Sequence, residues 1–477
     1  MQSVGKISKW AKESTAFKLF VIGFLIIILL VPMGMVDSLI RDRGWNKTKV
    51  ENEIFNVWGN AQTLQGPIIT IPYNSYYWDY YEEELRDSNK TITKKELKKT
   101  LEYAHFLPNK LIINGDINPS IRYRSIYEAV VYNSDFNISG TFPKIDMSDW
   151  QIKESDILYD LATISFGISD LRGVEERIKI SFDNKEGFFN PGIKSAQVSK
   201  AFRSGVSMPI KFDNSKDNIG FNFNLKLRGS QSILFLPYGK ESLISIKSNW
   251  SNPSFIGDFL PTKRDIRVDG FTALWKVVDI NRAYPQKFLG KDISRLSTKK
   301  QNRYKSRYNY NRVVNHKYNS AFGVDLKIPV DYYQKSDRSI KYGILIIILT
   351  FVTFFFVEIF QKRAIHPFQY ILVGFGLVLF FALLISFSEH IGFDLAYLVS
   401  AIATITSITL YSISVFKDRK SVTALFAIMG LFYSFVYLLL QLQDYSLLLG
   451  TIMLFITLST IMYISRDIDW YSIKREE

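Results

Sequence analysis

The sequence lacks cysteine altogether and contains only four histidines in 477 residues. The absence of cysteine excludes disulfides, thiolate nucleophiles, and zinc or iron–sulfur sites with thiolate ligands. His105, His316, His366 and His390 lie far apart in the sequence and leave little scope for a histidine-based metal centre. We therefore expect neither a metal nor another cofactor.

Charge is scarce toward the C-terminal end. Residues 341–477 contain nine Lys or Arg and nine Asp or Glu, whereas residues 37–340 contain 46 and 35. Hydrophobic residues make up 47% of the chain, and the net charge is +14. This composition excludes a disordered or fibrous protein. The pattern predicts a polar domain enclosed between two apolar membrane segments.

The first apolar segment, residues 19–36, has no charged side chain. At 1.5 Å per residue a helix of this length covers about 27 Å, which nearly matches a hydrocarbon core of about 30 Å. Lys6, Lys9, Lys12 and Lys18 precede it and indicate a cytoplasmic flank. A cleaved signal peptide is the alternative, but no small-x-small cleavage site follows. We favour an uncleaved anchor.

Five more apolar stretches follow, at roughly 343–360, 368–387, 393–416, 421–440 and 445–464. Their connections are alternately rich in Lys and Arg and devoid of them, which predicts six spans with both termini cytoplasmic. The predicted domains are a cytoplasmic N-terminus (1–18), an anchor (19–36), an exported β-rich domain (37–340), a five-helix bundle (341–465) and a cytoplasmic tail (466–477). The predicted fold class is thus a helical membrane bundle with a large exported domain.

Few charges fall inside the spans. Glu358 lies near a cytoplasmic end, where pairing with Lys362 at i+4 or snorkelling explains it. In the span 393–416, Ala396, Ser400 and Thr404 recur at helical spacing, which favours close helix packing over a substrate path. Since no carboxylate lies at mid-membrane and no matched pair of broken helices is present, a transporter is not supported.

Glu389, His390, Asp394 and Asp444 cluster at the predicted outer interface. A fixed polar cluster there would dock the exported domain onto the bundle, although such charges also commonly mark a helix end. Glu389 and His390 form the one compact acid–base candidate. The sequence contains no GxSxG, HExxH, calcium-loop or phosphate-loop motif. We expect a protein without enzymatic activity.

Residues 37–340 show short β-rich runs separated by turn residues. The runs include 67–73, 138–142, 220–227 and 242–247, and alternation is clearest in FNFNLKLRG. Helical periodicity is convincing only near 96–103 and weaker after Arg41. The pattern predicts an antiparallel, sandwich-like domain with few helices.

A basic stretch at 287–317 contains ten Lys or Arg and one acid, with tyrosines interleaved. Its export makes nucleic acid an unlikely partner. Contact with anionic lipid or an envelope glycan is one interpretation, and a solvated insertion is the other. The candidate contact residues are Lys299, Lys300, Arg303, Lys305, Arg307 and Arg312.

Several separated segments resemble one known family in the same order. They include PMGMV (32–36), LIRDR (39–43), WGNAQTLQGP (58–67), RYRSIYE (122–128), KYG (341–343), HPFQY (366–370), SEHIGF (388–393), QDY (443–445) and DWY (469–471). The chain resembles the CreD family of bacterial inner-membrane proteins. The resemblance implies a role in cell-envelope integrity and envelope stress response, with the lipid bilayer and unidentified envelope proteins as partners, and no catalytic residues. A transporter or lipid-handling permease and a membrane-anchored enzyme remain the alternative functions.

The alternation of basic loops yields a topology prediction. Reporter fusions at Lys420 and Arg475 should be cytoplasmic, and fusions after Thr91 and Gln443 should be exported. An exported reporter at Lys420 would contradict the six-span arrangement.

Overall fold

The structure, a computed structural model, describes residues 15–84, 91–202, 204–211, 216–282, 284–290, 320–326, 328, 332–361, 364–416, 418–442 and 446–466. The chain divides into a membrane unit, residues 1–47 and 330–477, and a β unit, residues 48–329. Both boundaries lie inside the predicted exported range 37–340. The reason is that the helices at either boundary continue past the apolar segments into polar sequence.

The membrane unit contains long helices at each predicted span. They are α2 (Thr15–Trp58, with its last residues in the β unit), α4 (Tyr332–Gln361), α5 (Pro367–Ile391), α6 (Phe393–Phe416), α7 (Arg419–Gln441) and α8 (Ser446–Ser465). All are long and apolar enough to cross a membrane, which confirms the six predicted spans. Polar side chains cap two of these helices: His366 accepts a hydrogen bond from the Phe368 N–H at the start of α5, and the Asp418 carboxylate accepts hydrogen bonds from the first turn of α7.

Glycines let α2 approach its neighbours closely. A Cβ atom on Gly374 of α5 would lie 2.2 Å from Cδ1 of Leu29, and one on Gly343 of α4 would lie 2.2 Å from Cε of Met33. A larger residue at these positions would require the Leu29 and Met33 side chains to move. Small residues serve helix packing in lipid in this way.

The small residues of α6 are also packed. Ala396, Ser400 and Thr404 are all buried within the membrane unit. This confirms the interpretation of the stripe as a helix-packing surface.

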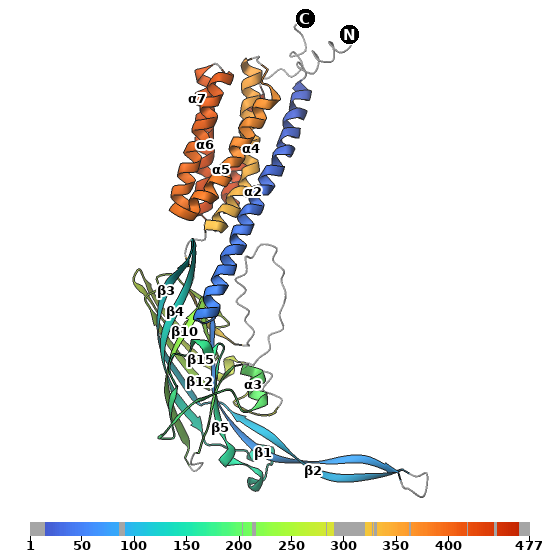
Figure 1. Cartoon of the computed structure of the whole chain (residues 1–477), viewed down its shortest axis with the longest axis vertical. Coiled ribbons are helices and arrows are strands. Elements are labelled where there is room, and N and C mark those ends of the chain that lie inside the picture. The colour runs from blue at the N-terminus through green and yellow to red at the C-terminus, as the bar shows by residue number, and fades with distance from the viewer. Residues whose placement is uncertain are drawn as a thin grey trace. The chain divides into compact units, whose positions relative to one another are not determined.

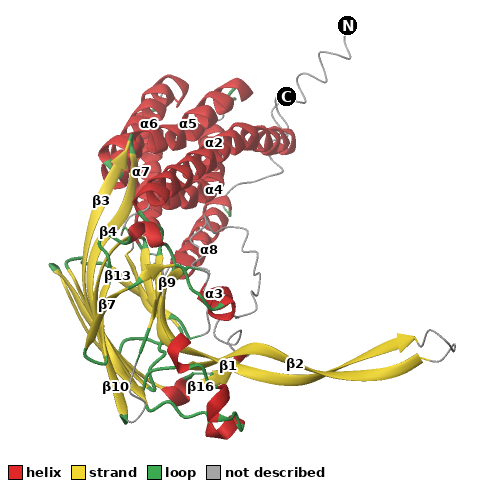
Figure 2. Cartoon of the chain, turned by 60° about the horizontal axis from the view of Figure 1, so that its bottom comes forward, coloured by secondary structure: helices red, strands yellow, loops and turns green. Residues whose placement is uncertain are grey.

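The β unit consists of two sheets (Figures 1 and 2). The first has the order β13-β17-β11-β1-β5-β9-β8, with β2 on β1 and β16 on β2. Its strands are β1 (Gln62–Glu84), β2 (Thr91–Phe106), β5 (Thr163–Ile168), β8 (Asn190–Pro191), β9 (Gly205–Pro209), β11 (Ser232–Phe235), β13 (Pro253–Gly257), β16 (Lys287–Leu289) and β17 (Phe322–Leu326).

The second sheet has the order β14-β15-β12-β3-β4-β10-β6-β7. Its strands are β3 (Lys110–Arg124), β4 (Tyr127–Pro143), β6 (Lys179–Phe182), β7 (Lys185–Phe188), β10 (Asn218–Ser230), β12 (Glu241–Ser248), β14 (Lys263–Arg267) and β15 (Gly270–Val278). The short helix α3 (Ala196–Phe202) also belongs to the β unit. All four β-rich runs predicted from the sequence lie in strands.

The two sheets share one hydrophobic core. Phe166 of β5 meets Phe223 of β10 edge to face at 5.0 Å, and Phe136 of β4 meets Phe235 of β11 at 5.9 Å. Along β10, alternate apolar residues are buried, as the pattern FNFNLKLRG predicts. The predicted sandwich is confirmed, and its pairing is antiparallel except for β1 with β11 and β3 with β12.

The helix predicted near 96–103 is wrong, because these residues lie in β2. Strand β2 pairs in continuous register with β1, from Ile69 opposite Phe106 to Glu84 opposite Thr91. Pairing with the preceding strand outweighs the helix propensity of the lysine-rich run. The weaker helical signal after Arg41 is confirmed, since α2 continues to Trp58.

Strands β1 and β2 extend beyond the sandwich as a two-stranded arm, residues 74–84 and 91–101, which projects from the sheets in both views (Figures 1 and 2). His105 lies at its root and is fully buried. The imidazole bonds to the Thr70 hydroxyl at 3.0 Å and to the Gln197 carboxamide oxygen at 3.2 Å. The neutral Nε2–H tautomer satisfies both contacts.

Burial lowers the pKa of His105 to about 4 from its usual 6.5. Between these values the unfolded chain binds a proton that the folded β unit does not, so stability falls as pH decreases. Between pH 7 and 4.5 we expect this group to reduce the free energy of unfolding by about 2 kcal/mol. Thermal unfolding of the detergent-solubilised protein should show a smaller loss for His105→Gln, and the wild-type loss for the exposed His390→Gln. Equal pH dependence of all three would contradict the assignment.

Candidate functional site

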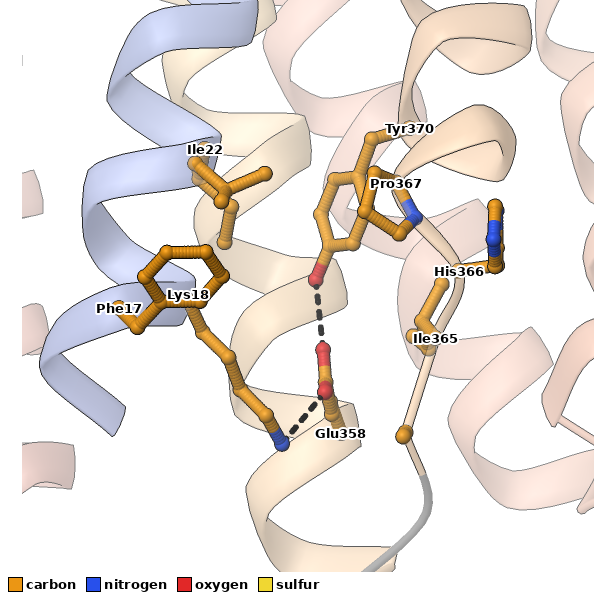
Figure 3. Close-up of a pocket in the computed structure, with 10 residues that line it drawn as sticks. Phe17, Lys18, Ile22, Glu358, Ile365, His366, Pro367 and Tyr370 are labelled. Carbon is orange, nitrogen blue, oxygen red and sulfur yellow. Dashed lines mark hydrogen bonds and ion pairs between the residues drawn. The ribbon is translucent and has the colours of Figure 1, made fainter. Parts of the chain in front are cut away.

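Charged and aromatic contacts fix helix α2 at several places along its length. The first, the Glu358 clamp, comprises Lys18, Glu358 and Tyr370. Glu358 of α4 is only 4% exposed, and its Oε1 lies 2.8 Å from the Lys18 ammonium of α2. The Tyr370 hydroxyl of α5 donates to Oε2 at 3.1 Å (Figure 3). One carboxylate thus joins three helices.

This geometry corrects the sequence-based account of Glu358. Snorkelling is wrong, because the side chain is buried, and Lys362 lies outside the described residues. From the sequence, Lys18 belongs only to the basic flank of the first span, and Tyr370 belongs only to the HPFQY segment. Neither spacing nor composition relates them to Glu358, since the three residues come from different helices.

The Glu358 clamp borders a cavity of about 420 Å³. Its lining is formed by Phe17, Lys18, Val21, Ile22, Glu358, Ala364, Ile365, His366, Pro367 and Tyr370. Figure 3 shows the Lys18 ammonium and the Tyr370 hydroxyl both directed at the Glu358 carboxylate. In such apolar surroundings an unpaired carboxylate is costly, so the clamp favours one register of α2 against α4.

The second fixed point, the Glu389 clamp, comprises Arg43, Tyr333 and Glu389. The Tyr333 hydroxyl of α4 donates to Oε1 of Glu389, at the end of α5, at 3.0 Å. Arg43 of α2 lies 3.7 Å from Oε2. Lys47 of α2 also lies 5.9 Å from the centre of the Tyr333 ring. Again α2, α4 and α5 are joined.

The other predicted interface residues have different surroundings. Asp394 of α6 accepts a hydrogen bond from Gln441 of α7 at 2.7 Å and lies 3.9 Å from Lys335 of α4. His390 is exposed. Asp444 lies outside the described residues, as do all six candidate contact residues of the basic stretch. Glu389 and Asp394 therefore take different partners within the membrane unit, and docking of the exported domain stays a prediction.

The third fixed point, the Trp58 joint, lies in the β unit at the end of α2. The Trp58 ring has the Arg122 guanidinium 4.7 Å and the Arg228 guanidinium 5.3 Å from its centre. Its indole N–H donates to the Tyr132 carbonyl at 3.3 Å. Strands β3, β4 and β10 thus all contact this one side chain.

The helix end itself is capped within the Trp58 joint. Gly59 has φ +140°, which favours glycine, and it ends α2. The Arg172 guanidinium donates to the Asn56 carbonyl of the last turn at 2.7 Å and pairs with Asp170 at 2.7 Å. The hydrogen bond from Arg172 lowers the pKa of Asp170 to about 2. The WGNAQTLQGP segment is therefore a structural connection between α2 and β1.

The chemistry of these contacts favours a role in positioning helix α2. Both oxygens of Glu389 are engaged, by Tyr333 and Arg43, so the pair formed by Glu389 and His390 is not arranged as a free acid and base. Over the part of the chain that the structure describes, no three His, Asp or Glu side chains gather as metal ligands would. The site holds a helix in place.

The Glu358 clamp yields a stability prediction. Glu358→Gln should leave Lys18 unpaired and reduce stability by about 2 kcal/mol, because breaking a largely buried ion pair costs a few kcal/mol. Adding Lys18→Met should restore part of the loss. The control is Asp337→Asn, which breaks an i,i+4 surface pair with Lys341 and should cost about 0.5 kcal/mol or less. The readout is thermal unfolding in detergent, and equal effects of Glu358→Gln and Asp337→Asn would contradict the clamp.

Comparisons with known proteins agree with the residue motifs. The family model described as inner membrane protein CreD matches residues 14–471. The inner membrane protein CreD of Escherichia coli K12 is 30% identical over 450 residues, covering 94% of this chain and 92% of that protein.

A solved structure, a putative nutrient binding protein from Legionella pneumophila, is 10% identical. It covers 38% of this chain and 68% of its own, with a TM-score of 0.21, too low to inform the fold. The family match spans nearly the whole sequence, so this chain belongs to the CreD family of inner-membrane proteins.

Proposed function

We propose that this protein supports cell-envelope integrity and the response to envelope stress without catalysing a reaction. The β unit is exported and both termini are cytoplasmic. The alternation of basic and non-basic loops supports this orientation, and the family assignment supports the inner membrane as its location. In this role the protein links the state of the exported β unit to that of the membrane unit.

The observation that carries the proposal is the continuity of α2. It is one helix of 44 residues, whose segment up to Lys47 belongs to the membrane unit and whose segment from Thr48 belongs to the β unit. The membrane unit holds its segment through the Glu358 and Glu389 clamps, and the β unit holds its own through the Trp58 joint. A hydrogen-bonded helix transmits rotation and translation along its axis, so a shift in one unit reaches the other.

The engagement of the charged residues supports a role without catalysis or transport. Glu389 accepts a hydrogen bond from Tyr333 and forms an ion pair with Arg43, and Glu358 pairs with Lys18 and accepts a hydrogen bond from Tyr370. A proton-transferring or ion-coupling carboxylate needs an open coordination or proton path. Here both carboxylates hold helices.

Two insertions of equal length between Lys47 and Thr48 test the coupling. A seven-residue Gly-Ser insertion breaks the helix, whereas a seven-residue Ala-rich helical insertion preserves it and nearly preserves its phase, since two turns take about 7.2 residues. In a deletion strain screened for envelope stresses, we expect the helical insertion to restore wild-type resistance and the flexible one to fail. Both variants should accumulate equally and show equal protease resistance.

Full complementation by the flexible insertion would refute coupling through α2. Wild-type stress resistance of the deletion strain itself would refute the envelope role.

A further inference from the structure

The two-stranded arm presents large side chains to solvent. Beyond Tyr73, the described strand that pairs with β1 is β2 alone. Trp78 is 50% exposed and Tyr80 65% exposed, and Leu97 and Leu101 of β2 are about half exposed. An isolated two-stranded ribbon is marginally stable in water, and exposed aromatic residues commonly mark binding surfaces.

The two faces of the arm differ in chemistry. Because side chains alternate along a strand and opposite residues share a face, Tyr76, Trp78 and Tyr80 lie on one face together with three residues of β2. These are Lys95, Leu97 and Lys99, opposite Tyr80, Trp78 and Tyr76. We call this set the aromatic face.

The reverse face carries balanced charge. Tyr77 and Tyr81 lie there with Asp79, Glu96, Lys94 and Lys98, and Lys98 is paired with Asp79. On the aromatic face Lys95 lies 4.8 Å from the centre of the Trp78 ring. Acids lie toward the ends of the row: Glu82 is near the tip, and near the root Asp156 accepts a hydrogen bond from the Tyr76 hydroxyl at 3.1 Å. The aromatic face therefore combines aromatic rings with positive charge, and the reverse face provides a matched comparison.

The row of rings has the geometry of a platform for a linear polymer. Successive rings on one face of a strand are about 7 Å apart, with the lysines on the neighbouring strand. The C–H faces of sugar rings pack on aromatic rings, whose faces carry partial negative charge. Lysines beside the row suit carboxylates attached to such a polymer. A fluid bilayer surface would not require this alignment.

We propose that the aromatic face binds a linear, carboxylate-bearing glycan of the cell wall. Its sugar rings stack on Tyr76, Trp78 and Tyr80, and its carboxylates pair with Lys95 and Lys99. The choice of the cell wall as the source rests on the exported location of the β unit proposed above. The binding itself is measured in vitro, so its failure and a failure of the predicted topology are distinguishable.

The test is co-sedimentation of the full-length protein in detergent with purified peptidoglycan sacculi. Trp78→Ala combined with Tyr80→Ala should weaken binding by roughly tenfold or more, since a few aromatic residues usually dominate an interface. The matched control on the reverse face, Tyr77→Ala with Tyr81→Ala, should change it less than about twofold. Lys95→Gln with Lys99→Gln should weaken binding and reduce its salt dependence, whereas Lys94→Gln with Lys98→Gln should not. Any contribution of the basic stretch is common to all variants and cancels in the comparison.

Three outcomes would overturn the proposal. The first is no binding by the wild-type protein, and the second is equal binding by the variants of the two faces. The third is a loss, specific to the aromatic face, of binding to phosphatidylglycerol vesicles or of self-association by light scattering, with binding to sacculi unchanged. That result would assign the face to a lipid surface or to a second copy of the chain.

Discussion

Helix α2 combines a segment suited to lipid and a segment suited to water in one hydrogen-bonded helix. Its first part is an uncharged apolar run, and its later part is rich in Asp, Arg, Lys and Glu. Hydrophobicity alone cannot position such a helix in lipid, because lipid tails are as apolar as its side chains, so close packing such as that of Leu29 and Met33 and charged contacts are needed. The structure supplies the charged and aromatic contacts as the Glu358 clamp, the Glu389 clamp and the Trp58 joint. The two clamps also join α4 to α5, through Tyr370 with Glu358 and through Tyr333 with Glu389.

The three fixed points differ in physical character according to their surroundings. Glu358 is buried, where Coulomb attraction is strong and an unpaired charge is expensive, so Lys18 and Tyr370 are both needed. Glu389 has a longer ion pair supported by a tyrosine hydroxyl. At Trp58 the contacts are cation–π and backbone hydrogen bonds, which tolerate partial exposure. Position along α2 thus determines which kind of interaction holds it.

The β unit consists of a packed core and the two-stranded arm, which extends away from that core. The core lies between two sheets and is rich in aromatic pairs, such as Phe166 with Phe223. The arm continues β1 and β2 out of that core, and His105 at its root is buried among hydrogen-bond partners. A rigid root and an exposed ribbon together present side chains at a distance from the sandwich, which suits recognition better than catalysis.

The sequence alone determined the features that depend on local composition. The six spans follow from long apolar runs, and strand β10 follows from strict alternation of apolar and polar residues. The family follows from short motifs in the expected order. Pairing between distant segments needed the tertiary structure. Lys18, Glu358 and Tyr370 belong to different helices, and residues 96–103 form a strand because β1 lies beside them. Local propensity is worth only tenths of a kcal/mol per residue, so the contacts that a segment makes with other elements decide the outcome.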